Sequence, residues 1–222
     1  ADGTAKFTVD LPIGYSYSVK EDQAPEGYVR NTEDVYTFKF SYTNDKEATV
    51  SFAHTFSNDR VTAKINLFKV DKETGKAVPQ GDATLKGAVY GLYAREDIVH
   101  PDGATGTIYK AGEQVASLTT DDKGQASVNG LYLGKYYVKE KATVDGFVLD
   151  NEAREIDLTY RDQDPAEVTY SADWQNNRQK AEVEGVKKEK DSDRVLEGAV
   201  FALCAKNDIT GADGKVILEA DT

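Results

Sequence analysis

The stretch YSVKEDQAPEGYV (residues 17–29) returns later in the chain as YYVKEKATVDGFV (residues 136–148). In both copies apolar residues alternate with polar ones until a glutamate is reached, and a turn with glycine follows. The alternation predicts a β-strand with one buried face, and its phase places Glu21 and Glu140 on that face. Because burial of an unpaired charge is costly, each glutamate needs a partner or a bound proton.

Two further segments also recur along the chain. The segment 68–94, which ends in GAVYGLYA, returns at 186–205 with the ending GAVFALCA, and VSFAHTFSNDR (50–60) returns as VTYSADWQNNR (168–178). Such self-similarity indicates tandem copies of one structural unit. We predict three domains: the C-terminal part of a first repeat at residues 1–59, a complete middle repeat at 60–183, and the N-terminal part of a third repeat at 184–222.

The hydrophobic pattern within each repeat has a period of two residues, and turn signals such as HPDG and DDKG separate the segments. A sustained helical period is missing from the sequence. These features predict an all-β fold of tandem antiparallel β-sandwiches, with about seven short strands in a complete repeat and almost no helix. We read LPIGY at residues 11–15 as a turn before a strand.

Three polar residues occupy the buried phase of the middle repeat. Lys69 follows Ile65 and Leu67, Glu140 follows Tyr136 and Val138, and Asn176 follows Val168, Tyr170, Ala172 and Trp174. Strand ends often leave the core, so any one of these residues could simply be solvated. The first repeat nevertheless has Glu21 and Asn58 at the matching places, and eleven positions separate both Asn58 from Lys69 and Asn176 from Lys187. We therefore expect the three residue types to meet in a core.

Chemistry explains why an amine, a carboxyl group and an amide would meet there. Burial favours the neutral forms of lysine and of carboxylic acids. A neutral Lys69 amine is a nucleophile toward the carboxamide carbon of Asn176. A protonated Glu140 would polarise the amide oxygen by a hydrogen bond and shuttle a proton to the leaving ammonia. We predict a Lys–Asn isopeptide bond that forms once, without turnover.

The composition excludes several classes of partner. A formal net charge of −12 repels nucleic acid and anionic membranes. Cys204 is the only cysteine, so we expect a small buried apolar residue there, and His54 and His100 lie far apart without ligand spacing. We expect no metal, no cofactor, no nucleic-acid partner and no membrane insertion. Because Met is absent and no signal peptide opens the sequence, we expect a piece of a longer chain.

The motifs FKVDKETG…LKGAVYGLYA, GLYLGKYYVKE and KEDQAPEGY resemble the Cna protein B-type (SpaA-like) domains of Gram-positive cell-wall-anchored adhesins and pilins. The resemblance covers nearly the whole chain and implies an Ig-like or prealbumin-like sandwich. In that family a lysine on the first strand is joined to an asparagine on the last, and the glutamate of an E-T-x-A-P-x-G-Y segment is the catalyst. The middle copy, KEKATVDGF, lacks the Ala-Pro pair of this segment.

Carried over by position, the resemblance assigns Lys69 and Asn176 to the isopeptide bond and Glu140 to catalysis. Glu21 and Asn58 are then the partial site of the first repeat. Counting back from Leu196 favours Lys187 over Lys188 or Lys190 as the lysine of the third repeat. Head-to-tail pairing between two molecules, with Lys187 of one copy completing the first repeat of another, is a further prediction.

The residues and the resemblance favour a structural stalk module of an extracellular, cell-wall-anchored adhesin or pilin. Its expected partners are neighbouring domains of the same chain and, through a distal tip, a host surface or matrix protein. The alternative is a ligand-binding sandwich that recognises a host protein or a glycan through the excursion at residues 95–120. An enzyme with an external substrate is not expected, because the sequence shows no Ser-His-Asp set, catalytic Cys-His pair or phosphate loop.

Overall fold

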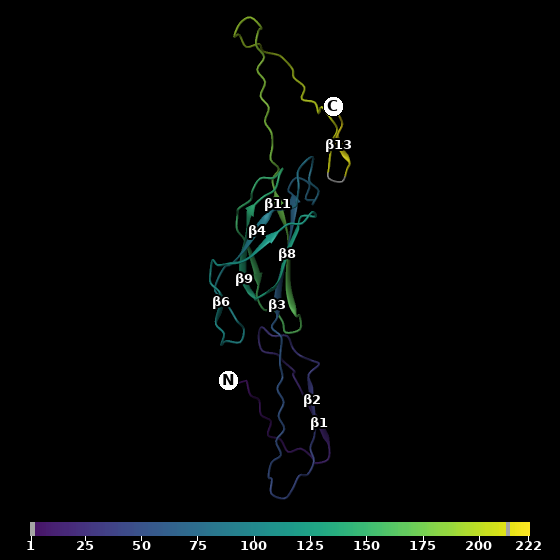
Figure 1. The fold of residues 1–222 in the computed structure, drawn as a ribbon, viewed down its shortest axis with the longest axis vertical. Helices are drawn as coiled ribbons and strands as arrows, with labels where there is room; N and C mark the ends of the chain where they lie inside the picture. Colours follow the sequence, from purple (N-terminus) through teal and green to yellow (C-terminus); the bar gives the residue numbers. More distant parts are fainter. Residues whose placement is uncertain (1–2, 212–213) are drawn as a thin grey trace. The chain divides into compact units, whose positions relative to one another are not determined.

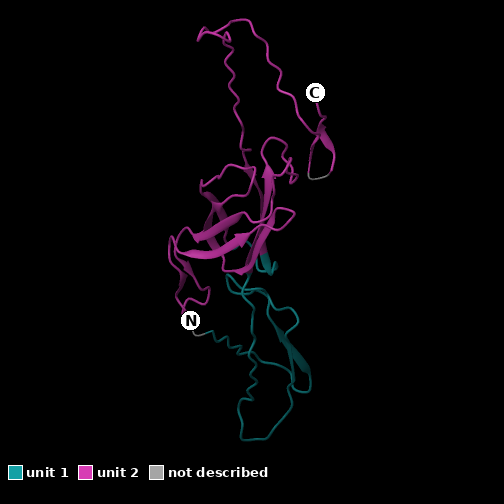
Figure 2. Ribbon diagram, turned by 45° about the horizontal axis from the view of Figure 1, so that its top comes forward, with its two compact units in different colours: residues 1–61, 160–167 teal, residues 62–159, 168–222 magenta. Residues whose placement is uncertain are grey.

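The computed structural model describes residues 3–211 and 214–222, and these residues form strands, turns and loops without a helix (Figure 1). None of this described part could therefore cross a membrane as a helix. Contacts divide the chain into two compact units: unit 1 contains residues 1–61 and 160–167, and unit 2 contains residues 62–159 and 168–222 (Figure 2).

Unit 2 contains two sheets that form a β-sandwich. One sheet has four strands in the order β10-β9-β4-β7, and the other has three in the order β11-β3-β8. Their bounds are β3 (Thr62–Asp71), β4 (Val89–Ala94), β7 (Gln114–Thr119), β8 (Gln125–Leu131), β9 (Gly134–Ala142), β10 (Arg154–Leu158) and β11 (Glu167–Asn176). The predicted all-β sandwich of about seven strands is confirmed.

The period-two pattern of the sequence accounts for the core of unit 2. Alternate residues of β3 and β9 are buried, including Ile65, Leu67, Tyr136 and Val138, because neighbouring strand residues point to opposite faces of a sheet. Trp174 on β11 is 2% exposed and lies edge-on to the buried ring of Tyr90 on β4. The polar residues that continue the buried phase of these strands therefore end inside this core.

The first and last strands of the sandwich, β3 and β11, are neighbours that run in the same direction. The Asn66 side chain donates a hydrogen bond to the Ser171 hydroxyl at 3.1 Å, and the Lys72 N–H donates to the Asn176 carbonyl at 3.0 Å. Residue numbers thus rise together along both strands. The neighbouring pairs β3–β8, β4–β7, β4–β9 and β9–β10 are antiparallel.

The excursion at residues 95–120 contains a short hairpin of β5 (Ile98–Val99) and β6 (Thr107–Tyr109) before the chain enters β7. Some of its polar groups pair within the excursion. Lys110 forms an ion pair with Asp97 at 2.9 Å, and Asp102 accepts hydrogen bonds from Thr105 and from two backbone N–H groups. Ligand binding by this segment stays a prediction.

Unit 1 contains the antiparallel pair β1 (Ser16–Lys20) and β2 (Val35–Lys39). The expected turn precedes β1 at residues 13–14. The alternation at residues 50–58 also predicts a strand, and this prediction is wrong, because the structure assigns no strand there. A strand needs the backbone groups of a neighbour, and β1 and β2 are the only strands that pair in the described part of unit 1.

The segment that repeats the first strands of the sandwich, residues 186–205, is likewise without a strand and forms one bridge, Lys188 with Val195. Beyond it lie the short strands β12 (Ile209–Thr210) and β13 (Val216–Leu218). Cys204 is exposed, which corrects the expectation of a buried thiol. Without a facing sheet, the alternation of this segment has no core to bury its apolar residues.

The turn that follows β9 makes a prediction about stability. Gly146 has a φ of +87°, and a methyl group at this position would collide with Ala83. Gly75 has a φ of +65°, but a methyl group there would meet no atom within 4 Å. We expect Gly75→Ala to cost about 1–2 kcal/mol of stability and Gly146→Ala to cost more. Thermal unfolding followed by the fluorescence of Trp174 measures both, and equal losses would contradict the predicted collision.

Candidate functional site

The three polar residues in the buried phase of the middle repeat lie together inside unit 2. Lys69 comes from β3, Glu140 from β9 and Asn176 from the end of β11. Their exposed fractions are 0%, 1% and 0%. The parallel pairing of β3 with β11 places Lys69 beside Asn176, and β9 of the opposite sheet supplies the carboxyl group.

The hydrogen bonds of the site join all three side chains. Lys69 Nζ donates to Asn176 Oδ1 at 2.7 Å and to Glu140 Oε1 at 2.8 Å. Asn176 Nδ2 donates to the other carboxyl oxygen, Glu140 Oε2, at 2.6 Å. The carboxyl group therefore bridges the amine and the amide nitrogen, and the amine touches the amide group whose carbon it would attack. The predicted hydrogen bond from Glu140 to the amide oxygen is corrected, because that oxygen accepts from Lys69 and Glu140 contacts the amide nitrogen instead.

A loop after β9 completes the site with residues that the sequence analysis did not single out. Thr143 Oγ1 accepts a hydrogen bond from Lys69 Nζ at 3.1 Å, and the ring of Phe147 lies 5.0 Å from this nitrogen. The Val148 carbonyl accepts from Asn176 Nδ2 at 3.0 Å, and the Asp150 N–H donates to Glu140 Oε2 at 2.9 Å. The loop thus fixes the amide and the carboxyl group from one side.

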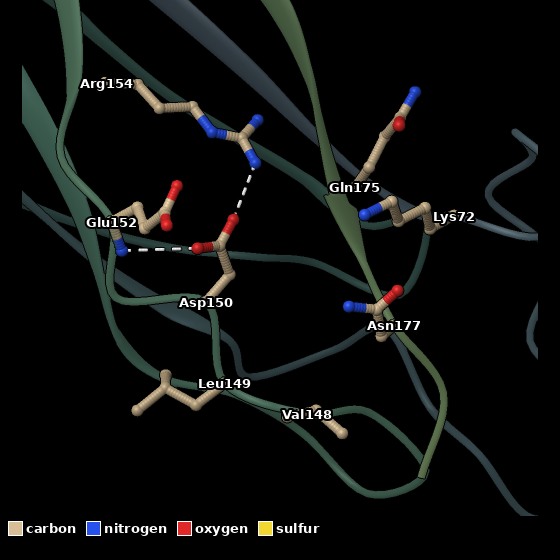
Figure 3. A pocket seen from close by; sticks show the side chains of 8 residues that line it. All are labelled: Lys72, Val148, Leu149, Asp150, Glu152, Arg154, Gln175 and Asn177. Carbon is tan, nitrogen blue, oxygen red and sulfur yellow. Dashed lines mark hydrogen bonds and ion pairs between the residues drawn. The ribbon is translucent and has the colours of Figure 1, made fainter. Parts of the chain in front are cut away.

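The Asp150 side chain anchors this loop at a pocket (Figure 3). Arg154 donates to the Asp150 carboxylate at 2.7 Å, and the Glu152 N–H donates to it at 3.2 Å, as the dashed lines of Figure 3 show. The Arg154 guanidinium also lies 3.9 Å from the centre of the Trp174 ring. The pocket is lined by Lys72, Val148, Leu149, Asp150, Glu152, Arg154, Gln175 and Asn177.

The electrostatics of the site shift the Lys69 amine toward its neutral form. Burial lowers the pKa of Lys69 below its ordinary value of 10.5, and the hydrogen bond and charge of Glu140 oppose this shift only in part. Tyr90 lies opposite Glu140 in the pairing of β4 with β9, and its buried hydroxyl makes no hydrogen bond. Burial and the charge of Glu140 raise the pKa of Tyr90, so its hydroxyl stays neutral.

The acid–amide pair of the first repeat has the same hydrogen bonds within unit 1. Asn58 Nδ2 donates to Glu21 Oε2 at 2.6 Å and to the Val29 carbonyl at 2.9 Å, and the Asn31 N–H donates to Glu21 Oε2 at 2.8 Å. Val29 and Asn31 follow Glu21 at the same spacings as Val148 and Asp150 follow Glu140. The repeat in the sequence could therefore have indicated which loop residues hydrogen-bond to the glutamate and the asparagine.

The third candidate lysine, Lys187, is exposed. Its backbone carbonyl accepts a hydrogen bond from the Leu196 N–H at 2.9 Å, so the segment forms a loop at this point. The structure joins Lys69, Glu140 and Asn176 into one site and Glu21 with Asn58 into another pair. Lys187 belongs to neither of these two groups of hydrogen-bonded side chains.

The lowered pKa of Lys69 predicts how the stability of uncross-linked chain depends on pH. The Asn176→Ala variant has no amide to react. Between the folded-state pKa of Lys69 and 10.5, its folded form binds fewer protons than its unfolded form, so the free energy of unfolding should rise as pH increases. Adding Lys69→Met should remove this rise. Denaturant unfolding across this pH range measures the difference, and identical profiles would show that Lys69 titrates normally.

Comparisons with known proteins found a matching family model and several similar solved structures. A family model described as "SpaA: Prealbumin-like fold domain" matches residues 1–54 and 63–174. Among solved structures, the Bacillus anthracis TIE protein is 26% identical, with a TM-score of 0.48, and the match covers 76% of this chain and 26% of that one. The shaft pilin SpaA of Lactobacillus rhamnosus GG is 15% identical, with a TM-score of 0.39 and coverages of 78% and 70%.

The major pilin subunit BcpA of Bacillus cereus is 21% identical, with a TM-score of 0.32, and the match covers 53% of this chain and 29% of that one. The chain thus spans less than a third of the TIE protein and of BcpA. A search of curated proteins found no match to the sequence. The family model covers most of the residues, and the chain belongs to the SpaA family of prealbumin-like fold domains.

Proposed function

We propose that this chain is a structural stalk module of a Gram-positive surface adhesin or pilin, in which Lys69 and Asn176 form an autocatalytic isopeptide bond. The observation that carries the proposal is the buried contact of the Lys69 amine with both the Asn176 amide and the Glu140 carboxyl group. Membership of the SpaA family supports the structural role. The module is not an enzyme in the usual sense, because the reaction consumes its own side chains.

The reaction balances without a cofactor or another reactant. The neutral Lys69 amine attacks Cγ of Asn176, a new carbon–nitrogen bond forms, and the bond from Cγ to Nδ2 breaks to release ammonia. Glu140 contacts both nitrogens, so its carboxyl group is placed to take a proton from Nζ and deliver one to Nδ2. The hydrogen bond that Asn176 Nδ2 donates to the Val148 carbonyl holds the leaving nitrogen in place.

The bond would close a loop of 107 residues between the first and last strands of the sandwich. The chain-entropy model assigns a closure of this size about 4.7 kcal/mol of stabilisation. The bond would also have a mechanical effect. Tension on a chain of such modules enters unit 2 at β3 and leaves it at β11, and these parallel neighbours would otherwise slide past each other. A covalent bond between them takes the load off the hydrogen bonds of the sheet.

A stalk module of this kind fits an extracellular position on a cell wall. Neighbouring domains of the same chain are its proposed partners, and a host surface or matrix protein would be met by a distal tip of the whole protein. The covalent bond provides stability against force and proteolysis in a chain whose only cysteine, Cys204, cannot form an internal disulfide.

Intact mass spectrometry tests the bond. The wild-type chain should weigh one ammonia less than its sequence, because one amide nitrogen leaves. Lys69→Met, Asn176→Ala and Glu140→Gln should each keep the full mass of their own sequences, since each removes the amine, the amide or the proton shuttle. The matched control Lys187→Ala should still lose one ammonia. A wild-type mass equal to the sequence mass would rule out the reaction.

Single-molecule pulling tests the load path. In the cross-linked chain, the segment from Lys69 to Asn176, which are 107 positions apart, should add no length at any force that leaves covalent bonds intact. In Glu140→Gln, unfolding should release this segment and lengthen the chain by about 350–390 Å, at about 3.3–3.6 Å per residue. The same release in the wild type would contradict a load-bearing bond.

Denaturing gels test the predicted head-to-tail pairing. If Lys187 of one copy attacks Asn58 of another, concentrated chain should form a ladder of covalent oligomers. Lys187→Ala and Asn58→Ala should each abolish the ladder while leaving the loss of ammonia at Asn176 unchanged. A single band for the concentrated wild-type chain would refute pairing between molecules.

A further inference from the structure

A second pair of side chains joins the strands that carry Lys69 and Asn176. Asp71 lies two residues after Lys69 on β3, and Arg178 lies two residues after Asn176. Arg178 Nε donates a hydrogen bond to Asp71 Oδ2 at 2.5 Å. The two members of this ion pair are 107 residues apart, and so are Lys69 and Asn176. Both pairs therefore belong to one register of β11 against β3.

Asp71 of the ion pair is buried, and the more exposed Arg178 makes a further contact with Glu73. The Asp71 side chain is 1% exposed and that of Arg178 is 21% exposed. The second oxygen of Asp71 accepts the Glu73 N–H at 2.8 Å, and Arg178 Nη1 donates to the Glu73 carboxylate at 3.0 Å. Arg178 also pairs through its backbone with Phe147, from the loop that holds the site. These contacts hold both side chains in place, so a shift of one strand along the other would break the ion pair.

A register shift would separate the reacting groups. A slip of one residue turns the side chains of a strand to the opposite face, so Asn176 would leave the core. A slip of two residues restores the face but moves the strand by about 7 Å, far beyond the 2.7 Å contact between Lys69 and Asn176. Either slip would also leave the buried Asp71 carboxylate without its cation, which is strongly unfavourable.

We propose that Asp71 and Arg178 are a positioning pair for the cross-linking reaction, setting the register of β11 on β3 that brings the Asn176 amide against the Lys69 amine. Neither residue touches the reacting atoms, so both act through the two strands. The proposal rests on the isopeptide reaction proposed above. It adds a requirement to that reaction beyond the amine, the acid and the amide.

Each of the other repeats carries one half of this spacing in its sequence. Arg60 follows Asn58 by two positions, as Arg178 follows Asn176, and Glu189 follows Lys187 as Asp71 follows Lys69. Arg60 also forms a backbone bridge with Tyr28, which corresponds to the bridge of Arg178 with Phe147. The positioning pair thus has a sequence signature, in which an acid lies two residues after the lysine and an arginine two residues after the asparagine.

Refolding separates positioning from simple stabilisation. Unreacted chain is recovered in guanidinium from inclusion bodies, its full mass is verified, and dilution starts folding. Trp174 is the only tryptophan and lies in the core of unit 2, so its fluorescence follows folding, while intact mass at timed acid quenches follows the loss of ammonia. The variants are Arg178→Gln, Arg178→Lys and Asp71→Asn. Arg95→Gln is the matched control, because it removes an exposed ion pair with Glu155.

We expect Arg178→Gln and Asp71→Asn to reach the fluorescence of the folded chain but to lose ammonia at least tenfold more slowly than the wild type. Arg178→Lys keeps the positive charge but lacks the guanidinium group, so its rate should lie between those of Arg178→Gln and the wild type. Arg95→Gln should react at the wild-type rate. Because burial sets the pKa of Lys69, each slow variant should be slower by the same factor at every pH.

Wild-type rates in folded Arg178→Gln and Asp71→Asn would overturn the positioning role. A rate that falls only in proportion to the folded fraction would also overturn it, because the pair would then merely stabilise the fold. If Arg178→Gln does not fold, the same comparison is made with Arg178→Lys: its rate of ammonia loss is set against its folded fraction. A wild-type chain that folds and keeps its ammonia would instead refute the isopeptide reaction itself, and this result is distinct from the others.

Discussion

The burial of a lysine amine against an asparagine amide and a carboxyl group is the constraint on which unit 2 depends. Each of these groups alone would be costly to remove from water. Together, Lys69, Glu140 and Asn176 satisfy one another by hydrogen bonds of 2.6–2.8 Å, and the loop after β9 supplies the remaining partners. The same burial lowers the pKa of Lys69 and so raises the share of the nucleophilic amine. Stability and reactivity thus arise from one arrangement.

The topology gives this arrangement its mechanical meaning. The chain enters the sandwich at β3 and leaves it at β11, and these strands lie side by side in the same direction. Force along the chain would therefore shear β3 against β11. Lys69 with Asn176 and Asp71 with Arg178 both span this boundary, one as the proposed covalent bond and the other as a buried ion pair. The site therefore lies between the two strands that force would shear apart, where a covalent bond would resist that force.

Much of this site could be predicted from sequence, because strand phase and repetition are local signals. Alternation placed Lys69, Glu140 and Asn176 in the buried phase, and the structure brings the three together. The loop contacts of Thr143 and Val148 were missed. They lie in a turn, where no alternation of apolar and polar residues shows which groups face the site.

Other features depended on which segments find a partner, and alternation alone carries no such information. It predicted a strand at residues 50–58, and this prediction is wrong, because that segment has no neighbouring strand to complete a sheet. The expectation of a buried Cys204 came from the usual burial of a lone cysteine, and it is wrong because its segment forms no strand either. The ion pair of Asp71 with Arg178 was also missed. Its members are far apart in sequence, and only the register of β3 with β11 brings them into contact.

The electron density around Lys69 in an atomic-resolution crystal structure would show whether the isopeptide bond has formed. We expect continuous density from Nζ of Lys69 to Cγ of Asn176 at the length of an amide bond, about 1.33 Å, and no density for the departed Nδ2. Two separate side chains at hydrogen-bond distance, with the amide nitrogen still in place, would contradict this expectation.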